Sequence, residues 1–299
     1  MAWPRTSMPD RLGVRKTYKL FIGGAFPRSE SGRSYPVTGP DGVLLAHAAL
    51  ASRKDARDAV TAARGAFGGW SAATAYNRGQ VLYRIAELIE GRAAQFAAEL
   101  VMNEGLSAPA AQRSVGAAID RWVWYAGWPD KVAQVVGAVN PVAGPYFNFS
   151  VPEPTGVVAV IAPARPALLA LVSVLAPVIA TGNTAVVVAS EPGPLPAVTL
   201  AEVLATSDVP AGVVNILTGR AAELAPVLAA HMDVNAIDLS GVDPPARAEL
   251  ERLAAGNLKR VFAGAADHDA AEQDWAGPPG IGRLLAFLET KTVWHPVGS

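Results

Sequence analysis

The sequence contains no cysteine among its 299 residues. That absence excludes disulfide bonds, thiolate metal ligands, iron–sulfur clusters and every thiol nucleophile. Net charge is also small, because 25 Lys and Arg residues nearly balance 26 Asp and Glu residues. A chain of this kind lacks the basic surface of a nucleic-acid-binding protein, so we expect no nucleic-acid partner.

Long hydrophobic runs are missing as well. The longest apolar stretch lies between Arg165 and Thr181 and is interrupted by Pro166 and Pro177. It falls short of the roughly 20 apolar residues that a membrane-spanning helix requires. The N-terminal residues also lack the apolar segment of a secretory signal. We therefore expect a cytoplasmic protein with no membrane partner.

Hydrophobic residues nevertheless make up 51% of the sequence, which is enough for a sizeable core. Ser52 and Asp55 have the spacing of a helix-capping box, and the segments after them have helical periodicity. The pair Gly23-Gly24 predicts a turn between two short strands. The expected elements of this half are the strand pair at 18–26 and helices at 52–70, 77–89, 92–103 and 108–128.

Short, continuously apolar runs alternate with helical segments between residues 153 and 262. Strands that are buried on both faces have this pattern, which predicts a parallel sheet covered by helices. With right-handed crossovers the unit is a doubly wound, Rossmann-like α/β fold. The predicted strands lie at 157–161, 184–188, 213–217, 236–239 and 258–262.

Two segments flank this unit. Residues 146–151 alternate apolar and polar side chains, which predicts a half-buried strand in an arm at about 145–152. Residues 263–299 begin with a turn-rich stretch and end in an expected helix and strand. We therefore expect one domain at 18–262, with its wound core at 153–262, followed by a short linker and a C-terminal oligomerisation tail at 263–299.

Several blocks of the sequence resemble the aldehyde dehydrogenase superfamily. They are EPTGVVAVIAP at 153–163, ATGNTAVVVASE at 180–191, VPAGVVNILTG at 209–219, NLKRV at 257–261, LFIGGAF at 20–26 and ETKTVW at 289–294. The resemblance implies the family's Rossmann-like fold, its oxidation of aldehydes with NAD or NADP, and its association through the arm and the C-terminal strand. The pattern is similar to the shortened, cysteine-less second module of the family-16 aldehyde dehydrogenases.

The departures from the family pattern concern its chemistry. The family's nucleophile is a cysteine, which this sequence lacks, and the resemblance passes from Val261 almost directly to the C-terminal tail. The catalytic domain is therefore expected to be largely missing. Ala164-Arg165 stands where the family has Trp-Asn, whose asparagine helps to form the oxyanion hole, and Val188 stands where it has a lysine that contacts the adenosine ribose. Because the family reacts through a covalent thiohemiacetal, and because one lost oxyanion donor costs about 3–4 kcal/mol, we expect no catalytic residue.

The resemblance also implies a residual cofactor site. It places Ser190 and Glu191 at the adenosine end, where they are equally suited to cap the helix that starts near Leu195. Gly219 is expected to be a strand-to-helix turn first and a cofactor wall second. Ser240 belongs to a partial match with the family's Gly-Ser turn near the cofactor phosphates. The candidate cofactor-binding residues are Pro163, Ala164, Ser190, Glu191, Gly219 and Ser240.

Other chemical signatures are absent from the sequence. It has no Gly-x-Ser-x-Gly, Ser-x-x-Lys or His-Glu-x-x-His motif, no Walker loop and no Gly-x-Gly-x-x-Gly after a strand. The four histidines lie far apart, which favours surface positions over metal ligands. Asp267 and Asp269 lie in a loop rich in Ala, Gly and Pro and are expected to be solvated. Trp122, Trp124 and Trp128 are typical of helix packing or an interface.

Three functions remain open at this point. The favoured one is a structural or regulatory subunit, because the assembly segments are kept while the catalytic ones are lost. Such a subunit would form a homo-oligomer, or a hetero-oligomer with an active aldehyde dehydrogenase. The second is a module that binds NAD or NADP without chemistry. The third is an oxidoreductase that works only with a partner's nucleophile, which a fold alone does not support.

Overall fold

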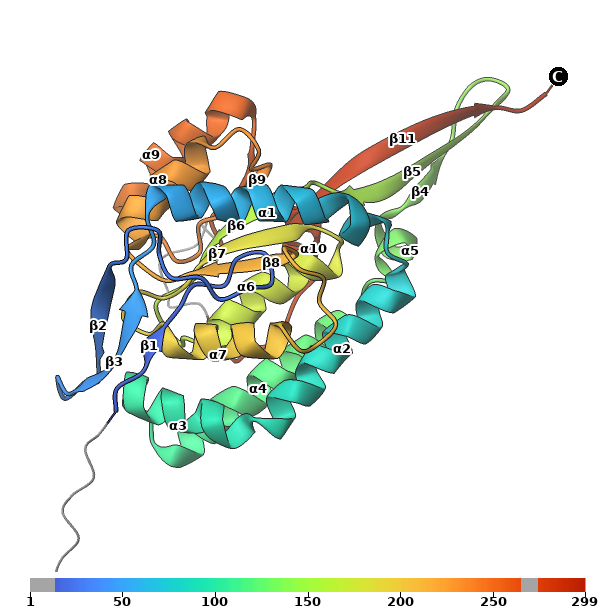
Figure 1. Ribbon diagram of the computed structural model, residues 1–299. Helices are drawn as coiled ribbons and strands as arrows, with labels where there is room; N and C mark the ends of the chain where they lie inside the picture. Colours follow the sequence, from blue (N-terminus) through green and yellow to red (C-terminus); the bar gives the residue numbers. More distant parts are fainter. Residues whose placement is uncertain (1–13, 265–273, 299) are drawn as a thin grey trace, which may run out of the picture.

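A parallel sheet forms the centre of the molecule, and a second, antiparallel sheet projects from it as an arm (Figure 1). The computed structural model describes residues 14–264 and 274–298. The predicted doubly wound α/β fold is confirmed. The expected loop that carries Asp267 and Asp269 lies outside the described residues.

The central sheet has five strands in the order β10-β9-β6-β7-β8. All of its neighbouring strands are parallel. From β6 the chain passes to β7 and β8 on one side and then crosses to the other side of β6 for β9 and β10. The order of the strands therefore reverses between β6 and β9. The bounds are β6 Val157–Ile161, β7 Thr184–Val188, β8 Val214–Leu217, β9 Ala236–Asp238 and β10 Arg260–Phe262.

Helices cover both faces of this sheet, as the continuous apolar runs require. Side chains alternate between the faces along each strand, so Val158 and Val160 join one core cluster while Val157 and Ile161 join the other. One face is covered by α1 Arg53–Ala72, α8 Ala221–Ala230 and α9 Pro244–Ala254 (Figure 1). On the other face α6 Leu169–Ala180 and α7 Leu195–Leu204 contact the strands. Helices α2 Ala75–Gly91, α3 Ala93–Glu104 and α4 Ala108–Ala126 pack against those two helices as a further layer.

The predicted capping box at the start of α1 is confirmed. The Ser52 hydroxyl accepts from the backbone N–H of Asp55, and the Asp55 carboxylate accepts from the Ser52 N–H at 2.8 Å. Asp55 is buried and also accepts from the Ser29 hydroxyl at 2.7 Å. The cap therefore fixes the N-terminal segment to α1 as well as starting the helix.

In two later helices, α2 and α4, the side chains that the sequence pattern assigns to packing are buried. In α2, Leu82, Ile85 and Ile89 are buried. In α4, Trp122 is fully buried, while the rings of Trp124 and Trp128 lie 5.2 Å apart at its end. The tryptophans therefore serve helix packing, one of the two expected roles.

The N-terminal sheet differs from the expectation. Gly23 and Gly24 do form a turn, with φ of +60° and +79°, but the predicted strand pair around it is limited to a bridge between Ile22 and Ala25. Phe21 instead bridges to Ile216 in β8. The sheet consists of β1 Thr17–Tyr18, β3 Leu44–Ala49 and β2 Ser34–Thr38, in that order. The sequence analysis passed over β2, in which only Tyr35 and Val37 are turned inward and the other residues are exposed.

The arm is an antiparallel sheet within one chain. Strand β5 Tyr146–Pro154 pairs with β11 Leu288–Pro296 over nine residues, and β4 Ala138–Asn140 covers part of the other edge of β5. The predicted arm strand is confirmed and reaches Pro154. Short helices stand at its base, α5 Val132–Val136 before β4 and α10 Gly282–Ala286 before β11, and the turn η1 Ala255–Asn257 precedes β10.

Candidate functional site

The carboxyl edge of the parallel sheet is the candidate site. In open α/β sheets a ligand crevice forms outside the carboxyl ends of the strands, at the point where the strand order reverses. Here that point lies between the ends of β6 and β9. The topology places every predicted cofactor residue at this edge. Pro163 and Ala164 follow β6, Ser190 and Glu191 follow β7, Gly219 follows β8, and Ser240 follows β9.

Ser190 joins two loops of this edge. Its buried hydroxyl donates to the Ala164 carbonyl at 2.8 Å and accepts from the Gly193 N–H at 3.1 Å. Helix α7 has Pro194 at its N-cap and no side-chain cap. The expectation that Ser190 caps α7 is therefore wrong, because the turn at Gly193 takes up its hydroxyl before the helix begins.

Glu191 lies beside Ser190 and is exposed. Its carbonyl accepts from the hydroxyl of Tyr35, a half-buried residue of β2, at 3.4 Å. Burial raises the pKa of Tyr35 above its usual range, and the nearby Glu191 carboxylate raises it further. The small N-terminal sheet therefore contacts the loop that follows β7. Sequence reasoning missed Tyr35 because a tyrosine in a mostly exposed strand gives no signal of this position.

Two glycines pack against backbone at the edge of the sheet. Gly219 has φ of +146°, and a Cβ there would lie 3.1 Å from the Ala51 nitrogen. This geometry supports the expected role of Gly219 as a turn. The Gly241 N–H donates to the Ile161 carbonyl at 3.0 Å, and a Cβ at Gly241 would overlap the Ala162 carbonyl oxygen. The loop after β9 therefore lies directly on the end of β6, where only glycine fits.

The helix after β6 does not fit the phosphates of a dinucleotide. In the Rossmann arrangement a glycine-rich turn brings phosphates to the N–H groups of this helix. The connection from Ala162 to α6 contains Pro163 and Pro166 and no glycine. The N–H of Ala167 donates to a buried carboxylate, Glu104, at 2.8 Å. Burial raises the pKa of Glu104. A phosphate here would meet a carboxylate instead of free N–H groups.

The helix after β9 is equally unsuited to phosphate. Pro244 and Pro245 are the first two residues of α9, so two of its terminal N–H groups are missing. Asp243 stands at the N-cap and adds negative charge. The residues present therefore do not fit a dinucleotide pyrophosphate at either helix.

A buried ion pair lies beside this edge. Asp238, the last residue of β9, is fully buried, and its Oδ2 lies 2.8 Å from Nη1 of Arg283 in α10. Ser240 joins the pair, since its N–H donates to Asp238 at 2.8 Å and its hydroxyl accepts from Arg283 at 3.1 Å. Burial raises the pKa of Asp238, and the Arg283 charge opposes this shift. The signal for this pair was a single aspartate inside an apolar strand, which the sequence analysis passed over.

The sequence model of the aldehyde dehydrogenase family matches residues 26–269. The chain belongs to the aldehyde dehydrogenase family. It is 34% identical over 263 residues to the cytosolic 10-formyltetrahydrofolate dehydrogenase of Mus musculus, covering 84% of this chain and 28% of that protein. It is also 34% identical over 250 residues to the mitochondrial aldehyde dehydrogenase family 2 member B4 of Arabidopsis thaliana, covering 81% of this chain and 45% of that protein.

Solved structures of similar proteins have the same fold. The NAD+ complex of the Bacillus cereus aldehyde dehydrogenase superposes with a TM-score of 0.78 at 28% identity, covering 82% of this chain and 50% of that chain. PnpE from Pseudomonas sp. WBC-3 superposes with a TM-score of 0.77 at 30% identity, with the same coverage. The chain thus spans about half the length of these structures and less of the curated relatives.

Val188 and Arg165, which depart from the family motifs, differ in their exposure to solvent. Val188 is fully buried at the end of β7 and presents no charged group to the crevice. Arg165 is exposed in the connection after β6. Within residues 14–264 and 274–298, no three metal-ligating side chains gather into a cluster. In the same ranges, no helix is both long and apolar enough to cross a membrane.

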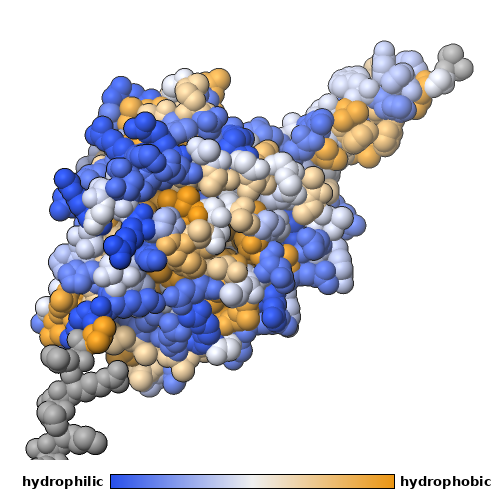
Figure 2. Space-filling view, viewed as in Figure 1, coloured by the Kyte–Doolittle hydropathy of each residue, from blue (hydrophilic) through white to orange (hydrophobic). Residues whose placement is uncertain are grey.

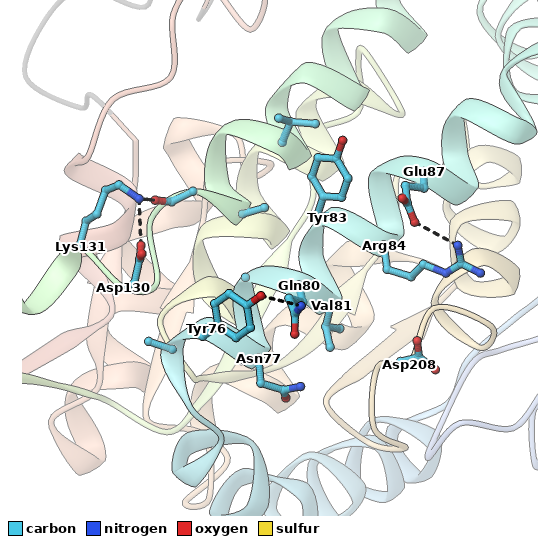
Figure 3. A pocket seen from close by; sticks show the side chains of 15 residues that line it. Tyr76, Asn77, Gln80, Val81, Tyr83, Arg84, Glu87, Asp130, Lys131 and Asp208 are labelled. Carbon is cyan, nitrogen blue, oxygen red and sulfur yellow. Dashed lines mark hydrogen bonds and ion pairs between the residues drawn. The ribbon is translucent and has the colours of Figure 1, made fainter.

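A groove of about 750 Å³ lies on α2 and α4 (Figure 3). Four of its charged side chains pair with close neighbours in sequence, Arg84 with Glu87 at 3.0 Å and Lys131 with Asp130 at 2.9 Å. The Tyr76 hydroxyl accepts from Gln80 in the same way. These pairs satisfy one another along the helix surface, so the groove lacks the convergent polar groups of an active site.

Proposed function

We propose that this chain is a non-catalytic structural or regulatory subunit of an aldehyde dehydrogenase assembly. One observation carries the proposal, namely an aldehyde dehydrogenase fold in a sequence without a cysteine. Aldehyde oxidation through a covalent intermediate requires a nucleophile, and no other nucleophile motif replaces it here. In this proposal the chain has lost the reaction and kept a role in assembly.

The arm supports association with another subunit. Strand β11 is at the edge of its sheet. The Thr155 N–H donates to the Phe287 carbonyl, and the Val297 N–H donates to the Pro145 carbonyl. In the antiparallel register these two hydrogen bonds show which backbone groups of β11 face β5. The N–H and C=O groups of its odd-numbered residues point toward β5, and those of its even-numbered residues point outward. An open edge of this kind can accept a strand from a partner.

Apolar side chains add to the arm's capacity for association. Figure 2 shows hydrophobic surface along the arm, where exposed apolar residues come from all three strands. They include Val139, Tyr146, Phe147 and Trp294. Apolar surface that gathers on a projecting element is typical of an interaction site. We infer that the partner is a second copy of the chain or an active aldehyde dehydrogenase.

Affinity purification from the native cells tests this proposal. The tagged chain would be recovered, its partners identified by mass spectrometry, and the eluate assayed for aldehyde-dependent NADH formation. A stoichiometric, cysteine-containing aldehyde dehydrogenase with activity would support a mixed assembly. A strict monomer in light scattering, alone and with each candidate partner, would refute the subunit role. Cell fractionation in the same experiment tests the proposed cytoplasmic location, in keeping with the relative from Mus musculus that is named cytosolic.

A second candidate is a nucleotide-binding module without chemistry. The exposed Glu191 at the adenosine end favours it, whereas the buried Val188 and the two unsuited helix N-termini count against it. Titration calorimetry with NAD+ and NADP+ decides between them. Heat that saturates at millimolar nucleotide would establish binding, and no heat would remove the candidate. An aldehyde-dependent reduction of NAD+ by the pure chain would instead establish an oxidoreductase.

A further inference from the structure

A small pocket lies on the α4 and α6 face of the sheet, beyond the Asp238–Arg283 pair. Its volume is about 220 Å³. Side chains from four separate parts of the chain converge on it, from α4, α6, the end of β10 and the segment at 274–283. Six of its lining residues are Arg121, Tyr125, Phe262, Asp274, Trp275 and Arg283.

The first observation is an imbalance of buried charge. Arg121 is only 8% exposed and Arg283 only 9% exposed. Arg283 has the buried carboxylate of Asp238 as its partner. Arg121 has backbone carbonyls instead, since its Nη2 donates to Trp275 at 2.8 Å and to Gly277 at 2.9 Å. A buried guanidinium is stabilised best by an anion, and the described residues supply Arg121 with no buried carboxylate.

The second observation is a buried tyrosine whose hydroxyl has no hydrogen bond within the described part of the chain. Tyr125 is 1% exposed and borders the pocket. Arg121 and Arg283 line the same pocket as Tyr125. Burial raises the pKa of Tyr125, and the charges of Arg283 and Arg121 oppose that shift. Three donor groups therefore meet at one pocket.

The walls of the pocket select among anions. The guanidinium of Arg283 lies 4.7 Å from the ring centre of Phe262 and 5.2 Å from that of Trp275. Two aromatic rings beside a cationic centre suit a flat, partly apolar anion better than a compact, strongly hydrated phosphate. Asp274 also lines the pocket, but it is exposed, and its Oδ1 accepts from the Ala276 N–H.

We propose that this pocket binds a small organic carboxylate. Its two oxygens accept from the Tyr125 hydroxyl and the Arg121 guanidinium, and its apolar body lies beside Phe262 and Trp275. The assignment is independent of the proposed subunit role, because it concerns the isolated chain and requires neither nucleotide nor aldehyde.

Titration calorimetry on the purified full chain tests the assignment, with benzoate as the probe. Propionate and inorganic phosphate form the comparison arms at constant ionic strength. We expect saturable benzoate binding, weaker propionate binding and no phosphate binding. Loss of one hydrogen bond to a charged group by Tyr125→Phe should weaken benzoate binding about tenfold or more. The matched control Tyr83→Phe removes a hydroxyl from an exposed tyrosine on α2 and should leave the affinity unchanged.

A second variant, Asp274→Asn, tests the proposal even if Tyr125→Phe folds poorly. It removes a negative charge near Arg121 and should tighten benzoate binding severalfold. Misfolding would weaken binding, so it could not produce this result. Failure of all carboxylates to bind at millimolar concentration would overturn the proposal. So would binding that is unaffected by Tyr125→Phe and Asp274→Asn, or a preference for phosphate.

Discussion

Asp238, the last residue of strand β9, forms an ion pair with Arg283 of helix α10, with 2.8 Å between Asp238 Oδ2 and Arg283 Nη1. Helix α10 has only five residues and would not be stable alone. The tail is held a second time where the Asn183 side chain donates to the Phe287 carbonyl at 2.9 Å. The segment at 282–288 is therefore part of the core and more than the short linker that the sequence indicated.

Replacing Arg283 should destabilise the fold strongly. Arg283→Met leaves Asp238 buried without its cation, a change that typically costs about 3–5 kcal/mol. Urea unfolding followed by circular dichroism measures the free energy of unfolding. Arg252→Met is the matched control, because Arg252 is exposed and pairs with Glu249 on the helix surface, so its loss should change the midpoint little. Equal effects of the two substitutions would show that the buried pair has no special role.

The loss of unfolding free energy caused by Arg283→Met should depend on pH. Burial already raises the pKa of Asp238 in the folded state, and loss of the Arg283 charge raises it further. An acid whose pKa is raised by folding loses stability as the pH rises through that folded value. The difference in unfolding free energy from the parent should therefore be larger at neutral pH than in mildly acidic buffer. A pH-independent deficit would assign the loss to packing and not to the charge of Asp238.

Gly241 should tolerate no side chain. A Cβ there overlaps the Ala162 carbonyl oxygen, so Gly241→Ala forces the loop away from β6 and should cost about 1–3 kcal/mol. Gly65→Ala is the control, because Gly65 lies within α1 with nothing near the added Cβ. Better helix propensity should stabilise that variant by about 0.5–1 kcal/mol. Thermal unfolding of both variants should therefore shift in opposite directions, and a shared direction would contradict the close approach.

The sequence predicts the central sheet well and the site less well, for physical reasons. Each parallel strand is buried on both faces, so its apolar run is visible without knowledge of its neighbours. Strand β2 is mostly exposed and carries no such signal. The partners of Ser190 and Asp238 lie 26 and 45 residues away, so only the folded chain brings them together. The sequence pattern also could not show that Glu104 would accept from the Ala167 N–H just before α6, because the two residues lie far apart in the chain.

Ser190 should contribute to stability through its two hydrogen bonds. Ser190→Ala leaves the buried N–H of Gly193 without its partner, which should lower the free energy of unfolding by about 1–3 kcal/mol. The control Ser71→Ala removes an exposed hydroxyl that bonds the Gly68 carbonyl within α1, and it should have little effect. If Ser190 instead served only a nucleotide, the substitution would alter NAD+ titration and leave denaturant unfolding unchanged.

The open edge of β11 can be tested with proline substitutions at two adjacent positions, which should have different effects. The N–H of Thr290 points outward in this register, so Thr290→Pro removes a donor that only an added strand could use. We expect it to leave the arm folded and to reduce the assembly measured by size exclusion with light scattering. Lys291→Pro removes an inward N–H that pairs with β5 and should disrupt the arm itself, lowering its protection from proteolysis. Thr290→Ala keeps the N–H and controls for the lost side chain. If Thr290→Pro assembled as well as Thr290→Ala, strand addition at this edge would be refuted, and the apolar faces of the arm would have to account for any association.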